Sequence, residues 1–218
     1  MTVYAPPEAQ LDIVHADDFL VVVDKPSGLL SVPGRGKDKA DCALSRAQAE
    51  FPDALTVHRL DMATSGLLLL ARSKEVQRAL SGQFARGEIA KRYLADVWGA
   101  PVAVSGEINL PLIIDWPRRP LQKVDWETGK PSITCYKTLS VYGRFSRLAL
   151  TPLTGRSHQL RVHLAEIGHP ILGDEFYAPP EALSARTRLA LHAASLGFLH
   201  PASGARIQLD SGCPFEAS

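Results

Sequence analysis

The residues with the clearest potential for chemistry lie in segment 57–66, which reads Val-His-Arg-Leu-Asp-Met-Ala-Thr-Ser-Gly and leads into the apolar run 67–71. Its carboxylate, Asp61, follows a cationic side chain on a loop that feeds a predicted buried strand. Such a group can act as nucleophile, acid or base if it is shielded from water and a partner sets its pKa. Taken alone, an aspartate in a loop is more often a turn or capping residue.

A second candidate is Tyr93, which directly follows Lys91 and Arg92. An aromatic ring beside two cations suits a nucleobase that must stack while its phosphates are held. On local sequence alone, a strand tyrosine packed against the core explains the same residues.

A third candidate is Arg161, in the run Thr-Gly-Arg-Ser-His-Gln-Leu-Arg-Val-His over residues 154–163. On a helix, Leu160, Leu164 and Ile167 share one face, and Arg161 lies one position from that face. An arginine beside a carboxylate holds it ionised and oriented through a bidentate pair. The alternative is a surface arginine on an amphipathic helix.

The histidines raise the question of a metal site. No His-Glu-x-x-His arrangement is present, and the interval of five between His158 and His163 places them on different faces of a helix. We therefore expect no metal, and we expect His58, His158, His163 and His192 to be structural or to contact RNA. A hydrolase built on His58 and Asp61 would need a further nucleophile or metal partner that the spacing does not supply.

Together these segments resemble the motifs of the RluA family of RNA pseudouridine synthases. The match rests on His58-Arg59-Leu60-Asp61 with Thr64-Ser65-Gly66, on Lys91-Arg92-Tyr93, and on residues 154–163. Residues 25–34 are similar to an early family motif of mainly architectural role, and residues 115–131 are similar to a segment typical of the RluA branch. The resemblance runs from about residue 12 to residue 209; residues 210–214 depart from the usual family ending, which bears on packing.

The resemblance implies a role for each candidate. Asp61 would be the essential catalytic residue, Tyr93 would stack on the target uracil and assist proton loss, and Arg161 would pair with Asp61. Leu191, or its neighbour Leu189, would lie beneath the base. Five further side chains are expected to bind the substrate: Arg59, His58, Arg156, Lys91 and Arg92. Arg59 is also expected to fill the place of an extruded uridine or to grip the flanking phosphates.

The implied reaction is isomerisation of uridine to pseudouridine in structured RNA, without a cofactor. Asp61 either attacks the sugar or removes a proton from it; the residues do not choose between these routes. The resemblance implies a dual substrate, a uridine in the tRNA anticodon stem-loop and one in a 23S rRNA hairpin. The alternatives are a single-substrate enzyme of the same family and, from another class, a non-catalytic RNA-binding domain.

Charge is unevenly distributed along the 218 residues, although the net charge is only +1. Residues 72–161 contain 15 basic and 7 acidic side chains, whereas both flanking segments are net acidic. A basic middle segment is compatible with a phosphate-binding face, and equally with ordinary solvated side chains. The apolar runs are too short to cross a membrane, no secretory signal begins the sequence, and three widely spaced cysteines favour reduced thiols, so we expect a cytoplasmic monomer.

The pattern predicts an α+β protein with a central mixed, largely antiparallel sheet flanked by helices and loops. Strands are expected at 20–23, 67–71, 93–98, 189–199 and 207–209, with a hairpin formed by 131–142 and 145–151. Helices are expected from an Asp41 cap to about residue 51, from a Ser73 cap over 74–86, and over 157–167; residues 34–41 are predicted to form a mobile loop. Residues 1–11 are expected to be an extension and 12–218 one catalytic domain, with no room for an S4-type RNA-binding domain.

Overall fold

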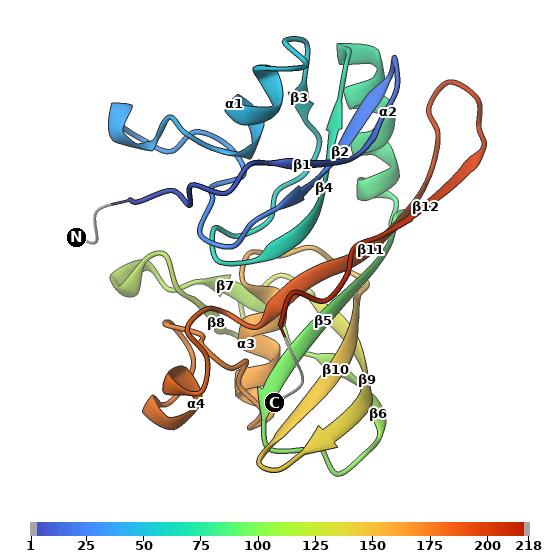
Figure 1. Ribbon diagram of the computed structural model, residues 1–218. Coiled ribbons are helices and arrows are strands. Elements are labelled where there is room, and N and C mark those ends of the chain that lie inside the picture. Colours follow the sequence, from blue (N-terminus) through green and yellow to red (C-terminus); the bar gives the residue numbers. More distant parts are fainter. Residues whose placement is uncertain (1–3, 216–218) are drawn as a thin grey trace. The chain divides into compact units, whose positions relative to one another are not determined.

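The computed structural model describes residues 4–215 and divides into two compact units. The first unit comprises residues 4–91 and 193–212, and the second comprises 92–192 and 213–215. The ends of the predicted ranges 1–11 and 12–218 therefore lie partly outside the described residues. Figure 1 follows the chain through both units by colour and label.

The first unit contains the helices that precede and follow the predicted catalytic segment along the chain. Its elements are β1 (Asp12–Ala16), β2 (Leu20–Lys25), η1 (Lys37–Lys39), α1 (Ala43–Gln48), β3 (Leu55–Thr56), β4 (Ser65–Ala71), α2 (Lys74–Ala85), most of β11 (Leu191–Leu199) and β12 (Arg206–Asp210). The strand order is β1-β2-β4-β11, with β12 beside β11 and β3 beside β4. Every pairing described within this unit is antiparallel.

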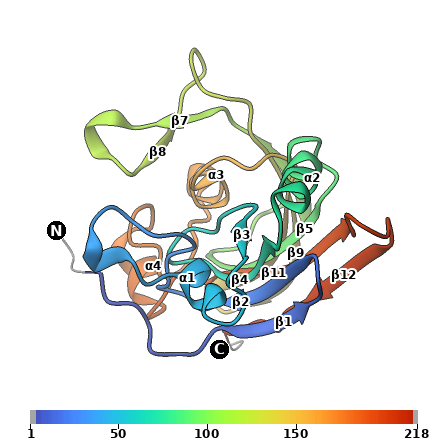
Figure 2. The ribbon, with the colours of Figure 1, turned by 90° about the horizontal axis from the view of Figure 1, so that it is seen from above.

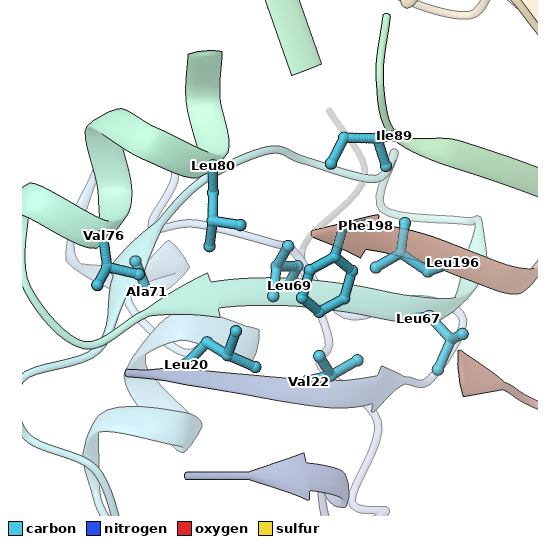
Figure 3. Packing of buried hydrophobic residues seen from close by; sticks show 10 residues of the cluster. All are labelled: Leu20, Val22, Leu67, Leu69, Ala71, Val76, Leu80, Ile89, Leu196 and Phe198. Atoms are coloured by element: carbon cyan, nitrogen blue, oxygen red, sulfur yellow. The ribbon is translucent and has the colours of Figure 1, made fainter. Parts of the chain in front are cut away.

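The core of the first unit forms around β4, whose seven residues are all buried. Because side chains alternate along a strand, Leu67, Leu69 and Ala71 point to the same face of β4. They pack with Leu80 of α2 and with other apolar side chains from both ends of the chain (Figure 3): Leu20, Val22, Val76, Ile89, Leu196 and Phe198. Helix α2 therefore covers the sheet directly beside the loop that carries Asp61.

The second unit is built on the strand order β5-β10-β9-β6. Its elements are β5 (Ala90–Trp98, shared with the first unit at its start), β6 (Ser105–Asn109), β7 (Leu112–Ile114), η2 (Trp116–Arg118), β8 (Gln122–Val124), β9 (Ile133–Tyr142), β10 (Phe145–Pro152), α3 (Gln159–Glu166) and α4 (Pro180–Ser184). Strands β7 and β8 form a separate antiparallel ribbon, which Figure 2 shows beside α3.

Most predicted elements are confirmed. The α+β class and the largely antiparallel sheet are as expected, the hairpin forms from β9 and β10, and Ser73 caps α2 through the backbone N–H of Val76. The ribbon β7–β8 and strand β6 were not predicted. Three-residue strands such as β7 and β8 are too short for alternation to identify them.

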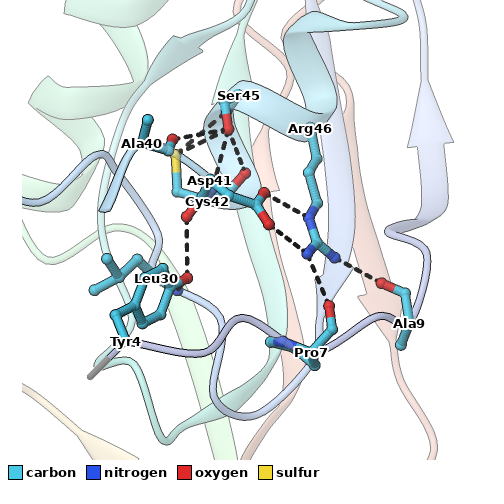
Figure 4. Close-up of polar contacts among 9 residues, drawn as sticks. All are labelled: Tyr4, Pro7, Ala9, Leu30, Ala40, Asp41, Cys42, Ser45 and Arg46. Carbon is cyan, nitrogen blue, oxygen red and sulfur yellow. Dashed lines mark hydrogen bonds and ion pairs between the residues drawn. The ribbon is translucent and has the colours of Figure 1, made fainter. Parts of the chain in front are cut away.

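The predicted Asp41 cap is wrong. Helix α1 is capped by Cys42, whose Sγ accepts the backbone N–H of Ser45 at 3.3 Å. Asp41 instead forms a bidentate ion pair with Arg46, with N–O distances of 2.8 and 2.7 Å. As Figure 4 shows, Arg46 also donates to the carbonyl oxygens of Pro7 and Ala9. These hydrogen bonds attach the backbone of residues 7–9 to α1.

Helix α3 also differs from expectation. It begins at Gln159 rather than 157 and is buried from Gln159 to Leu164, so it is not an amphipathic surface helix. Arg161 is only 2% exposed, which excludes the surface arginine that the pattern allowed.

Candidate active site

Asp61 lies in the loop between β3 and β4 and is partly buried. The loop closes as a turn in which the backbone N–H of Thr64 donates to the carbonyl oxygen of Asp61 at 3.1 Å. Thr64 and Ser65 are buried, so the chain enters β4 immediately after the turn. The carboxylate is thus carried by a short, enclosed connection rather than by a long surface loop.

The glycine that ends the motif is required by its position. Gly66 has φ +112°, and a Cβ added there would lie 2.4 Å from the carbonyl oxygen of Ala193 and 2.6 Å from its nitrogen. Backbone atoms cannot yield as a flexible side chain can, so only glycine allows β4 to approach this part of β11.

Lys25 holds the loop from the adjacent segment. Its side chain is fully buried, and Nζ donates to the carbonyl oxygens of Met62, Leu29 and Pro26 at 3.1, 2.7 and 2.9 Å. A buried ammonium is tolerated when its donors are satisfied in this way. One of these carbonyls belongs to the residue that directly follows Asp61.

Two serines and a glycine from the same early motif complete the hold on this loop. Ser31 Oγ donates to the carbonyl oxygen of Leu60 at 2.7 Å and accepts its N–H at 3.0 Å. Ser27 Oγ donates to the carbonyl oxygen of Ala63 at 2.6 Å, and the N–H of Gly28 donates to Met62 at 2.9 Å. The backbone on both sides of Asp61 is therefore fixed.

His58 is partly buried within the first unit. Its Nε2 accepts the backbone N–H of Leu69 at 3.0 Å, and its ring stacks on Phe84 with centroids 4.5 Å apart. Burial, together with the positive charge of Lys91, lowers the pKa of His58 to about 3. The imidazole is therefore neutral at physiological pH. It accepts the backbone N–H of Leu69, the β4 residue that adjoins the two residues paired with β3.

The cations predicted around the site differ in their surroundings. Arg59, Arg92 and Arg156 are exposed, whereas Lys91 is partly buried and burial lowers its pKa. Arg156 also donates from Nε to the carbonyl oxygen of Pro131 at 3.4 Å. The three arginines have the solvent access that phosphate binding requires. The positive charge of Lys91 instead lowers the pKa of His58.

Tyr93 lies on β5, where it is paired with Leu150 of β10, and its side chain is partly buried. Arg92 projects to the opposite face of the strand because successive side chains alternate. Arg92 is exposed on that face, so its role in binding RNA stays a prediction.

Arg161 forms a buried bidentate ion pair with Asp174. Nε and a terminal nitrogen donate to the two carboxylate oxygens at 2.8 and 2.6 Å, and the Asp174 side chain is fully buried. The guanidinium carbon also lies 4.9 Å from the ring centroid of Phe176 and 5.3 Å from that of Tyr177. Asp174 was not predicted as a partner of Arg161.

Two other predicted residues are placed in the second unit. Leu191 is 3% exposed at the start of β11, and Leu189 is equally buried, so burial does not choose between them. His163 is structural, as expected. Its ring lies 3.0 Å from both Thr134 Oγ1 and the carbonyl oxygen of Leu110, and burial lowers its pKa.

The first unit therefore contains Asp61, His58, Arg59 and Lys91, and the second contains Tyr93, Arg92, Arg156, Arg161 and Leu191. Their roles and the Asp61–Arg161 pairing stay predictions. Within residues 4–215, no group of three or more His, Cys, Asp and Glu side chains is placed to hold a metal ion. In the same range, no helix is both long and apolar enough to cross a membrane.

Sequence reasoning did not identify Asp174 and Tyr177 as partners of Arg161. The available signal was local: a polar, aromatic run, Asp174-Glu175-Phe176-Tyr177, follows a buried Ile171-Leu172 pair and Gly173. The sequence placed Lys25 only in a motif of architectural role and did not indicate its hydrogen bond to the Asp61 loop.

Comparisons with known proteins agree with this arrangement. A family model described as RNA pseudouridylate synthase matches residues 19–166. The dual-specificity RNA pseudouridine synthase RluA of Escherichia coli K12 is 52% identical over 203 residues, which cover 92% of this chain and 93% of that protein. The protein of the same name from Vibrio cholerae is 48% identical over 204 residues, covering 93% of this chain and 83% of that one.

Solved structures show the same fold. Human RNA pseudouridylate synthase domain containing 1 superposes with a TM-score of 0.79 at 27% identity, covering 97% of this chain and 88% of that chain. Human RNA pseudouridylate synthase domain containing 4 gives a TM-score of 0.74 at 25% identity, with coverage of 93% and 88%. The chain therefore belongs to the RNA pseudouridylate synthase family, which confirms the family, the α+β fold class and the isomerase activity predicted from the sequence.

Proposed function

We propose that this protein converts specific uridines to pseudouridine in structured RNA and that Asp61 is its catalytic carboxylate. The observation that carries the assignment is the fixed backbone around Asp61, where Lys25, Ser27 and Ser31 bind the neighbouring carbonyl groups. A rigid support of this kind is what a reacting side chain needs, since small displacements of a catalytic group are costly.

In the proposed reaction the bond between uracil nitrogen and the sugar breaks, the base turns, and a bond forms between the sugar and a ring carbon. The ring carbon loses its proton and the released nitrogen takes one up from solvent, so the product is an isomer of the substrate. Asp61 attacks the sugar or removes a proton from it. Tyr93 stacks on the uracil and assists proton loss from the ring carbon, and Arg161 keeps Asp61 ionised. An opposite charge within a few ångströms lowers a carboxylate pKa by roughly 1–3 units. The chemistry needs no cofactor or energy source.

The substrate contacts follow from exposure and charge. Arg59, two residues before Asp61, is exposed and can enter the place of an extruded uridine or grip the neighbouring phosphates. Arg92 and Arg156 are exposed cations for the RNA backbone, and Leu191 lies beneath the base. The neutral, buried state of His58 supports a role in holding the loop in place of the RNA contact predicted for it.

For the substrates, we propose a uridine in the tRNA anticodon stem-loop and one in a 23S rRNA hairpin. The support is the high identity to relatives named dual-specificity RNA pseudouridine synthase RluA. The protein acts as a cytoplasmic monomer in this proposal. Mapping pseudouridines in RNA from cells with and without the gene tests it: loss of sites in both RNA classes is expected, and loss in one class would leave a single-substrate enzyme.

Asp61→Asn tests the catalytic assignment. The variant should keep the fold and RNA binding but lose release of tritium from uridine labelled at the ring carbon. Arg59→Ala should instead weaken binding or turnover on folded RNA, and unchanged kinetics would remove Arg59 from the mechanism. Wild-type tritium release by Asp61→Asn would overturn the assignment of Asp61. If the wild-type protein binds RNA without forming pseudouridine, the rival reading of a non-catalytic RNA-binding domain holds.

A further inference from the structure

Tyr177 joins three elements of the second unit. Its hydroxyl oxygen accepts the backbone N–H of Gln122, at the start of β8, at 2.9 Å. The same oxygen lies 2.6 Å from Nδ1 of His158, the residue that precedes α3. A phenol oxygen can accept one hydrogen bond while its O–H donates another, so the contacts with Gln122 and His158 are compatible.

His158 has an unusual backbone conformation. Its φ of 54° and ψ of 15° are left-handed, and among residues 4–215 it is the one non-glycine residue with positive φ. Such conformations are strained for residues with a Cβ, persist only when the surroundings enforce them, and concentrate at functional sites. Here the bond to Tyr177 and the stacking on Phe176, with centroids 5.6 Å apart, hold the ring.

The same aromatic residues contact the Arg161 side chain. Phe176 and Tyr177 lie next to its guanidinium, and the backbone N–H groups of both donate to Asp174 Oδ1 at 2.9 and 3.3 Å. Asp174 therefore fixes one edge of the guanidinium, while the two rings limit where the group can move. Residues 174–177 thus contact the Arg161 guanidinium from one short segment of the chain.

We propose that Tyr177 is a positioning residue for Arg161 and that it acts together with His158. The hydroxyl of Tyr177 ties the turn that carries Asp174 to β8 on one side and to the start of α3 on the other. Arg161 lies three residues after His158, within the first turn of α3, so the position of His158 sets where the arginine leaves the helix. This inference rests on the proposed function, in which Arg161 serves the reaction.

Tyr177→Phe is the direct test because it keeps the ring beside Arg161 and removes only the hydroxyl. The single-turnover rate of pseudouridine formation on saturating folded RNA should fall about 10-fold, while the dissociation constant for RNA and the melting temperature stay close to wild type. A rate within about twofold of wild type in a folded variant would overturn the proposal.

His158→Asn provides the second variant, since asparagine tolerates the left-handed conformation but cannot place a ring nitrogen at the Tyr177 hydroxyl. If the two residues act as one unit, the double variant should be no more than about twofold slower than Tyr177→Phe. Losses that multiply would show independent effects and contradict the joint role.

Tyr142→Phe is the matched control within the same unit. Its hydroxyl lies beside the carboxylate of Asp96, and the residue belongs to none of the catalytic or binding positions, so its rate should equal wild type. The wild-type protein in the same assay separates the two hypotheses. An inactive wild type refutes the proposed function, whereas an active wild type with a fully active Tyr177→Phe variant refutes only the role of Tyr177.

Discussion

The loop of Asp61 and the turn of Arg161 are held in place by different kinds of interaction. The loop is fixed through its backbone, by donors from Lys25, Ser27 and Ser31. Arg161 is fixed through its side chain, by a buried ion pair with Asp174. A residue held by its backbone can exchange its side chain with little effect on folding, whereas a residue held by its side chain cannot.

The two regions also differ in the charge of the groups that hold each residue in position. Around Asp61, uncharged carbonyl groups receive the hydrogen bonds of Ser27, Ser31 and the buried Lys25 ammonium. Around Arg161, two full charges are removed from water together, so each depends on the other to offset its desolvation. We therefore expect catalysis and stability to be separable at Asp61 and inseparable at Arg161.

The largest stability effect should come from Asp174→Asn. The change removes the carboxylate charge that forms the buried bidentate pair with Arg161, which costs about 3–5 kcal/mol of unfolding free energy. Urea unfolding followed by circular dichroism measures it. Asp61→Asn is the matched carboxylate-to-amide variant at a partly buried position and should cost less stability than Asp174→Asn. Equal losses in the two variants would remove the distinction between the two regions.

Lys25→Met should have the next largest effect on stability. The thioether fills much of the same volume but removes the three hydrogen bonds of the buried ammonium, although the Met62 carbonyl keeps the N–H of Gly28 as a donor, so we expect a loss of about 2–3 kcal/mol. Lys37→Met, at an exposed lysine of η1, is the control and should stay within about 0.5 kcal/mol of wild type. A small effect at Lys25 would mean that the free energy needed to bury its charge is about equal to the free energy gained from its hydrogen bonds.

His58 should give the Asp61 loop a dependence on pH. Its pKa is lowered to about 3, so between pH 7 and pH 5 the unfolded chain takes up a proton at His58 that the folded protein does not. Wild-type stability should therefore fall on acidification relative to His58→Gln, by about 2 kcal/mol between these pH values. Denaturant titrations of both proteins at each pH measure the difference. A difference that does not change with pH would show that His58 titrates normally in the folded state.

The smallest effect is expected from Ser31→Ala. The variant removes one hydroxyl that bonds both the N–H and the carbonyl oxygen of Leu60, and we expect a loss of about 1 kcal/mol. Ser140→Ala, on the exposed part of β9, should leave unfolding unchanged. If Ser31→Ala is equally silent, the hold on the Asp61 loop depends mainly on Lys25.

The sequence predicted those features that depend on local pattern. Ser73 precedes the periodic segment of α2 and caps it, and the continuous apolar run at 67–71 forms β4 from its third residue to its end. The capping preference failed at Asp41, a favoured capping residue type, because an ion pair with Arg46, five residues later in α1, engages its carboxylate and leaves the cap to Cys42.

The candidate site could be predicted only in part. Asp61, Tyr93 and Arg161 were found because their motifs resemble a known family. The partner of Arg161 is 13 residues away along the chain, and the partner of His158 is 19 residues away, so no helical or strand period connects them. Likewise, the burial of α3 on all sides follows from packing and not from its own pattern.

The order of strands in the first unit has a consequence for synthesis of the chain. One edge of β4 pairs with β2, which is made earlier, but the other edge faces β11, which is made only after the whole second unit. Until then, β3 and the His58 ring cover only the end of that edge, from Leu69 to Ala71. An apolar strand with an open edge invites pairing with other chains. The nascent protein should therefore be most prone to aggregation before residues 193–199 leave the ribosome, and truncation ahead of β11 should yield insoluble protein.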